Sequence, residues 1–166
     1  MGIAHKFGDD VNTDYIIASK RKRDTVDPKK LVRFLMEDIR PGFGGTVRPG
    51  DFLVAGENFG CGSAMEIAPM VVVGAGIQAV LANSFARTFF RNAVNLGLLL
   101  VTCDTGQITE GDELALDLER GLVRNLTRRV EIPIQPLPAL MKKIVQAGGV
   151  IPFLESDEGR ALLSPL

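Results

Sequence analysis

Histidine and cysteine are scarce in this chain of 166 residues, which has one histidine, no tryptophan and two cysteines far apart, Cys61 and Cys103. A structural zinc site takes four cysteine or histidine ligands, and a cubane iron–sulfur cluster takes several thiolates. We therefore predict no metal site on this chain. Cys61 is either a small residue in a tight turn or a thiol activated by a helix N-terminus. Cys103 follows an apolar run and is predicted to be a core residue at a strand end.

Long apolar runs and a strong charge of one sign are also absent. The apolar run at residues 70–73 is far shorter than the roughly 20 residues that a membrane helix needs. Residues 1–6 lack the apolar core of a signal peptide. The formal net charge is −1, which gives no general attraction to nucleic acid. We therefore expect a cytoplasmic protein of one main domain with no membrane or nucleic-acid partner.

Glycine is plentiful, and the most informative segment is the glycine-rich stretch at residues 58–69, NFGCGSAMEIAP. It joins a strand-like run at 52–55 to a helix expected over about 64–73. Such a turn leaves backbone N–H groups unpaired at the positive end of the helix, where they can hold a carboxylate or stabilise a serine alkoxide. Ser63, with Gly62 before it, is therefore either a catalytic base or simply the N-cap of the helix.

Strand-like and helix-like patterns alternate along the chain. Asp27 and Pro28 are typical of a helix start, and apolar residues at 31, 34, 35 and 39 follow at helical spacing. The alternation favours a largely parallel sheet with helices on its faces. Strands are expected at 52–55, 79–82, 98–101, 112–119, 122–126 and 129–132, helices at 64–73, 85–95 and 138–147, and a loosely held tail at 156–166.

Three segments resemble one known family. Residues 59–69 resemble the FGCGSSREHAP signature of the small subunits of 3-isopropylmalate dehydratase and homoaconitase. Residues 9–17 resemble the family's D-x-V-x-T-D-x-I-I opening, and residues 84–97 resemble its SFAR-x-x-x-RN-x-x-N-x-G segment. The three blocks stand in the family order. The resemblance implies an α/β fold, a single swivelling β/β/α domain of the aconitase C-terminal type over residues 1–155.

The resemblance also implies the dehydration and rehydration of a hydroxy-dicarboxylate or hydroxy-tricarboxylate, as in leucine biosynthesis. In this family a separate large subunit carries a [4Fe-4S] cluster, and the small subunit supplies a serine as base for the carbon-bound proton. Ser63 matches that serine, and Gly62 and the N–H groups after it would stabilise its alkoxide. The chain is thus expected to hold no cofactor itself, and to act with a cluster-binding large subunit on a small hydroxy-carboxylate.

This sequence departs from the family pattern directly after Ser63. Ala64 and Met65 stand where the family has a serine and an arginine that contact a substrate carboxylate, and Ile67 replaces a histidine. Ala64 can offer only its backbone N–H. The basic run KRKR at 20–23 either supplies a replacement cation, through Arg21 or Arg23, or is a solvated loop.

Two classes of function therefore stay open besides an isopropylmalate-specific small subunit. One is a homoaconitase-type or other hydroxy-acid dehydratase small subunit, in which the basic run would bind an additional carboxylate. The other is a non-catalytic paralogue with an altered anion site. Self-association of the isolated chain also stays open, because a surface meant for a large partner would be uncovered.

The remaining polar residues are given structural roles. Asp10, Thr13 and Asp14 are expected to organise the opening loop through side-chain bonds to the backbone. Arg87 and Arg91 lie on an expected helix and are predicted to fix its packing. His5 is expected at the surface or at a strand end rather than on a metal.

Overall fold

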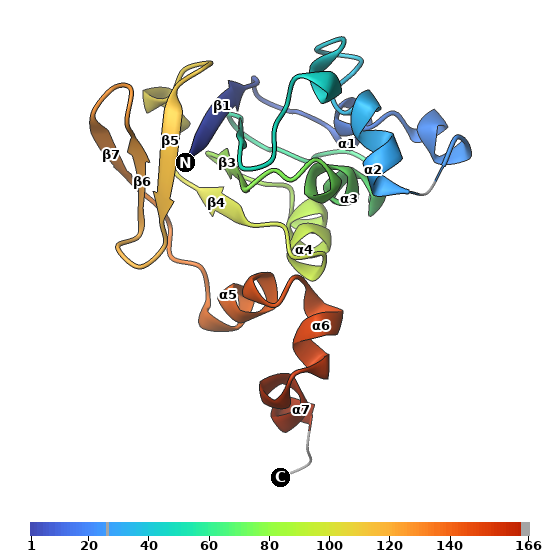
Figure 1. The fold of residues 1–166 in the computed structure, drawn as a ribbon, viewed down its shortest axis with the longest axis vertical. Helices are drawn as coiled ribbons and strands as arrows, with labels where there is room; N and C mark the ends of the chain where they lie inside the picture. Colours follow the sequence, from blue (N-terminus) through green and yellow to red (C-terminus); the bar gives the residue numbers. More distant parts are fainter. Residues whose placement is uncertain (26, 164–166) are drawn as a thin grey trace.

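The chain forms one curled sheet with helices packed beside its parallel half, as a computed structural model that describes residues 1–25 and 27–163 shows (Figure 1). The strand order is β4-β3-β2-β1-β5-β6-β7. β1 (Gly2–Lys6) joins the two halves, since it pairs parallel with β2 and antiparallel with β5. The other parallel strands are β2 (Phe52–Val54), β3 (Ala79–Ala82) and β4 (Leu100–Thr102), and the antiparallel ones are β5 (Glu113–Asp117), β6 (Leu122–Asn125) and β7 (Val130–Pro133).

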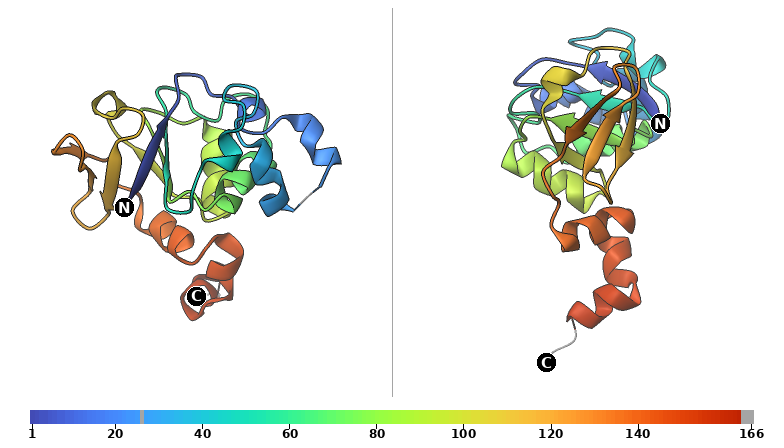
Figure 2. Two further views of the ribbon diagram at one scale, coloured as in Figure 1. Left: turned by 45° about the horizontal axis from the view of Figure 1, so that its top comes forward. Right: turned by 90° about the vertical axis from the view of Figure 1, so that its left-hand side faces the viewer.

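The helices fall into two groups. The first group lies beside the parallel strands, and the second extends from the body of the molecule at the C-terminal end (Figure 2). The first group comprises α1 (Thr13–Ile16), α2 (Pro28–Leu31), α3 (Ile67–Gly74) and α4 (Arg87–Asn95), and the second α5 (Ala139–Gln146), α6 (Val150–Glu155) and α7 (Asp157–Leu163). Short 3₁₀ turns are η1 (Ser19–Arg23), η2 (Val32–Phe34), η3 (Phe43–Gly45) and η4 (Thr105–Gln107). Among the described residues, no helix is both long and apolar enough to cross a bilayer.

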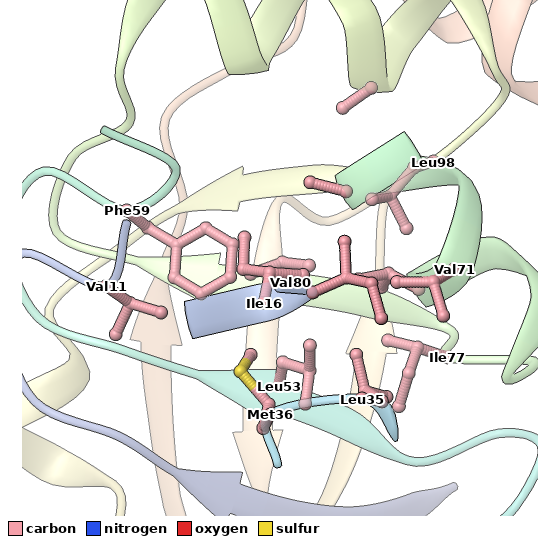
Figure 3. Close-up of a cluster of buried hydrophobic side chains, with 14 of the residues drawn as sticks. Val11, Ile16, Leu35, Met36, Leu53, Phe59, Val71, Ile77, Val80 and Leu98 are labelled. Atoms are coloured by element: carbon pink, nitrogen blue, oxygen red, sulfur yellow. The ribbon is translucent and has the colours of Figure 1, made fainter. Parts of the chain in front are cut away.

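The parallel strands are buried on both faces. Along β2, Leu53 packs into the cluster under the helices, whereas Phe52 and Val54 face a second cluster between the two halves of the sheet. Figure 3 shows the first cluster, in which Leu53 and Val80 from the strands lie with Val71 of α3. Burial on both faces is why these strands read as continuous apolar runs. The α/β class expected from the sequence is confirmed, and the strand at 79–82 is predicted to the residue.

The helix expected after Pro28 is shorter than its apolar spacing predicted. The Asp27 side chain accepts from the Lys29 N–H at 3.0 Å, so the predicted cap is confirmed. Helix α2 nevertheless ends at Leu31, and the N–H of Met36 donates to the Ile16 carbonyl at 3.0 Å. This bond to a distant segment takes the backbone out of the helical path.

The tail expected at 156–166 is helical over Asp157–Leu163. Ser156 begins this helix, since its hydroxyl oxygen accepts from the Gly159 N–H at 3.1 Å. Asp157 and Glu158 in the first turn complement the positive end of the helix dipole. Glu158 also pairs with Lys143 of α5, which ties the last helix to the group.

Candidate active site

The Ser63 loop, residues 55–66, lies at the edge of the sheet where the parallel strands end. Three loops meet there through backbone bonds. The Thr13 N–H donates to the Cys61 carbonyl at 2.9 Å, and the Phe59 N–H donates to the Ser84 carbonyl at 3.0 Å. The ring of Phe59 is buried among Ile16 and Val80 (Figure 3). The loop is thus anchored in the core, at the carboxyl edge where α/β sheets commonly bind ligands.

The structure corrects the position of the helix that follows. It begins at Ile67, with Glu66 at the N-cap position, four residues after Ser63. The N–H of Met65 donates to the Ser63 carbonyl at 2.8 Å, and the side chain of Met65 is only 5% exposed. This tight turn buries Met65 in the core and delays the helix. Ser63 is therefore not an N-cap. It precedes the first turn of the helix, and the helix dipole acts most strongly within that turn, so Ser63 lies outside its strongest field.

The backbone at Ser63 is held in place, and the residue itself is exposed to solvent. Gly62 has φ +90°, a left-handed conformation that favours glycine. The Ser63 carbonyl accepts a second bond, from the Thr13 hydroxyl at 2.9 Å. Ser63 is exposed, and within the described part of the chain its hydroxyl and the N–H groups of residues 62–64 have no hydrogen-bond partner. Consecutive N–H groups in a turn form a site that suits an anion.

The opening segment supports this loop, and its prediction is confirmed in part, because Thr13 and Asp14 bond to backbone groups whereas Asp10 bonds to a side chain. Asp10 accepts from the Asn58 side-chain amide at 2.8 Å, and Asp14 accepts from the Ser19 N–H at 3.1 Å. Asn12, for which the sequence suggested no role, caps α1 by accepting from the Tyr15 N–H at 2.9 Å. The bond from Thr13 to the Ser63 carbonyl was also missed. The one feature of the sequence that could have predicted this bond is that Thr13 and Ser63 both belong to segments that resemble the family.

The two cysteines behave as small apolar residues. Burial, and after it the charge of Asp10, raises the pKa of the Cys61 thiol, which is the opposite of activation. Burial raises the pKa of Cys103 to about 12, and its predicted place in the core is confirmed. His5 lies near the end of β1, which is the second of its two expected positions; its side chain is 12% exposed, and Nε2 lies 2.9 Å from Asp51 Oδ2. Over residues 1–25 and 27–163, no three His, Cys, Asp or Glu side chains gather as metal ligands.

Of the two arginines predicted to bind substrate, Arg21 is engaged within the chain. It lies in η1, and its guanidinium donates to both carboxylate oxygens of Glu37, at 2.7 and 2.8 Å. It also stacks on the Phe34 ring, 3.8 Å from the ring centroid. Arg23 is exposed on the same turn. A bidentate pair of this kind is directional and strong, so the carboxylate of Glu37 already occupies the place that a substrate carboxylate would take.

The ion pair between Arg21 and Glu37 predicts that part of the stability of the fold is lost at acidic pH. The bond from Arg21 holds the pKa of Glu37 below its ordinary value of 4.5. The pair therefore stabilises the fold above about pH 4.5, and this contribution is lost as the pH falls through the folded-state pKa. We expect Glu37→Gln to unfold at lower urea than the parent at about pH 6, and the difference to shrink below about pH 4. Glu119→Gln, at an exposed position, is the matched control; an equal pH profile for the two variants would contradict the prediction.

Comparisons with a family model, with curated relatives and with a solved structure all give the same family. The family described as "Aconitase C-terminal domain" matches residues 46–106, which include the Ser63 loop. The chain is 48% identical, over 97% of its length and all of the relative, to 3-isopropylmalate dehydratase small subunit 1 of Archaeoglobus fulgidus. It is 44% identical to the small subunit of Caldicellulosiruptor saccharolyticus, over 94% of this chain and 91% of that one. The crystal structure of 3-isopropylmalate dehydratase from Methanocaldococcus jannaschii superposes with a TM-score of 0.91 at 41% identity, over 98% of this chain and 95% of that one.

Proposed function

This chain belongs to the family of 3-isopropylmalate dehydratase small subunits, and from its geometry we propose that Ser63 is the base for the carbon-bound proton of the substrate. The chain is the small subunit of a heteromeric hydro-lyase of leucine biosynthesis, which isomerises a hydroxy acid by dehydration and rehydration. The names of its relatives favour this function over the homoaconitase-type and non-catalytic alternatives.

One observation carries the assignment of Ser63. It is the hydroxyl of an exposed residue beside three N–H groups that have no partner among the described residues, on a backbone that Thr13 fixes. During dehydration the Ser63 oxygen takes the proton from carbon, and during rehydration it returns the proton. A serine hydroxyl is too weak an acid to give much alkoxide in water, so the alkoxide that takes the proton needs nearby N–H donors and little competing solvent. We assign this role to the N–H groups of residues 62–64, and docking of the large subunit would exclude the solvent.

We assign the substrate carboxylate to the backbone rather than to Met65. The side chain of Met65 is buried, so the exposed N–H groups of Gly62 and Ala64 are the donors that this loop presents. A further cation is assigned to Arg23, because Arg21 is held by Glu37. An anion site built largely from N–H groups suits a dicarboxylate with an alkyl group better than a tricarboxylate.

The donors on this chain do not fit an iron–sulfur cluster. Such a cluster takes several thiolates, and the described cysteines are one half-buried thiol and one buried thiol, both with raised pKa. We therefore assign the [4Fe-4S] cluster to the large subunit. We also place the assembled enzyme in the cytoplasm.

Reconstitution tests the function. We expect this chain and a cluster-loaded large subunit together to isomerise isopropylmalate, followed by NMR of the substrate, whereas neither chain alone does so. Homoaconitate should be converted more slowly by the same pair. Visible absorption of the cluster confirms that the large subunit is loaded. Inactivity of the loaded pair, or a preference for homoaconitate, would refute the assignment.

A further inference from the structure

A cleft of about 480 Å³ lies beside the Ser63 loop and shares none of its residues. One wall is α4, with Arg87, Phe90 and Arg91, and the other is formed by the ends of β3 and β4, where Asn83 and Thr102 lie. Its volume is within the range of pockets that bind small molecules. The cleft is therefore a candidate binding site distinct from Ser63.

The two arginines of this cleft have no partner in the part of the chain that the structure describes. They are one helical turn apart, so both lie on the same face of α4. Both are exposed, contrary to the packing role predicted for them, and neither guanidinium has a hydrogen bond, ion pair or ring contact within residues 1–25 and 27–163. An unpaired pair of guanidinium groups is a ready carboxylate site.

Local electrostatics at the start of α4 also favours an anion. Arg87 is the first residue of the helix, and the first turn contains no acidic residue. Ala86 before it provides no side-chain cap, so the first N–H groups of the helix remain without a capping acceptor. A cation at this end of a helix is unfavourable unless negative charge compensates it. A bound anion would satisfy the guanidinium groups and the helix end together.

We propose that this cleft binds a small organic acid through one of its carboxylates. Arg87 and Arg91 hold one carboxylate, and the carbon body lies against the rings of Phe85 and Phe90, which line the same cleft. The aromatic wall favours an organic acid over inorganic phosphate, and the limited volume favours a small molecule over a segment of a partner protein. The proposal does not depend on the role of Ser63.

The test is an NMR titration of the full-length ¹⁵N-labelled chain with methylsuccinate at constant ionic strength. We expect saturable shifts for amides 84–91, with a Kd on the order of 1 mM because the arginines are exposed to solvent. Arg87→Gln and Arg91→Gln should each raise Kd about tenfold, the usual order for loss of a charge-assisted hydrogen bond. Arg124→Gln, an exposed arginine on β6, should leave Kd within about twofold.

Three outcomes would overturn the proposal. The first is shifts that do not saturate, or that fall only on residues 62–64. The second is phosphate binding as tightly as methylsuccinate, which would mean a general anion site. The third is an unchanged Kd in both glutamine variants together with weaker association with the large subunit, which would mean that the arginines bind an acidic segment of that partner. Retained dispersion of the spectrum shows that each variant is folded.

Discussion

Replacing Ser63 by alanine lowers the turnover of the reconstituted enzyme by about 10²–10⁴-fold, the range that general acid–base catalysis contributes. The variant loses the one oxygen of this residue that can accept the proton from carbon. Its backbone bonds remain, because the partners of Ser63, Thr13 and Met65, both contact its carbonyl. Steady-state rates with isopropylmalate give the measurement, and KM should change far less than kcat.

Two controls separate chemistry from folding. Ser63 is exposed, so the alanine variant should unfold within about 0.5 kcal/mol of the parent in urea. Ser19→Ala, at another exposed serine, should leave turnover unchanged. Full turnover in Ser63→Ala with an intact large subunit would remove Ser63 from the mechanism.

The sequence predicts the strands well because their apolar runs are a direct consequence of burial on both faces. The sequence places the start of α3 too early, at about residue 64. Neither the helical pattern nor the spacing of the glycines shows which way the side chain of Met65 turns. That side chain turns into the core, and the helix begins only at Ile67.

Contacts between segments far apart in the chain could not be predicted from the sequence. The Thr13 hydroxyl reaches the Ser63 carbonyl across 50 residues, and Arg21 reaches Glu37 across 16. Neither pair follows from helical or strand spacing. The first pair fixes the backbone of the proposed base, and the second pairs one of the two predicted substrate cations with a carboxylate of this chain. The family resemblance in the sequence points to Ser63, but only the fold shows what holds its backbone.

Gly60→Ala should destabilise the chain by about 3 kcal/mol, combining left-handed backbone strain with overpacking. Gly60 has φ +80°, and an added Cβ would lie 2.1 Å from Cγ of Phe89. The Phe89 ring cannot yield easily, because it is buried and packs edge-on against Phe59 at 5.3 Å. Urea denaturation measures the loss of stability. Because Gly60 lies three residues before Ser63, turnover should fall as well.

Gly42 provides a matched control for this variant. It has the same φ of +80°, but an added Cβ there meets nothing within 4 Å. Gly42→Ala therefore carries the backbone strain without the clash and should cost only about 1 kcal/mol. The difference between the two variants isolates the contact between Gly60 and Phe89. Equal losses of stability would mean that the Ser63 loop can move away from α4, and the rigid support that we assign to the base would then be absent.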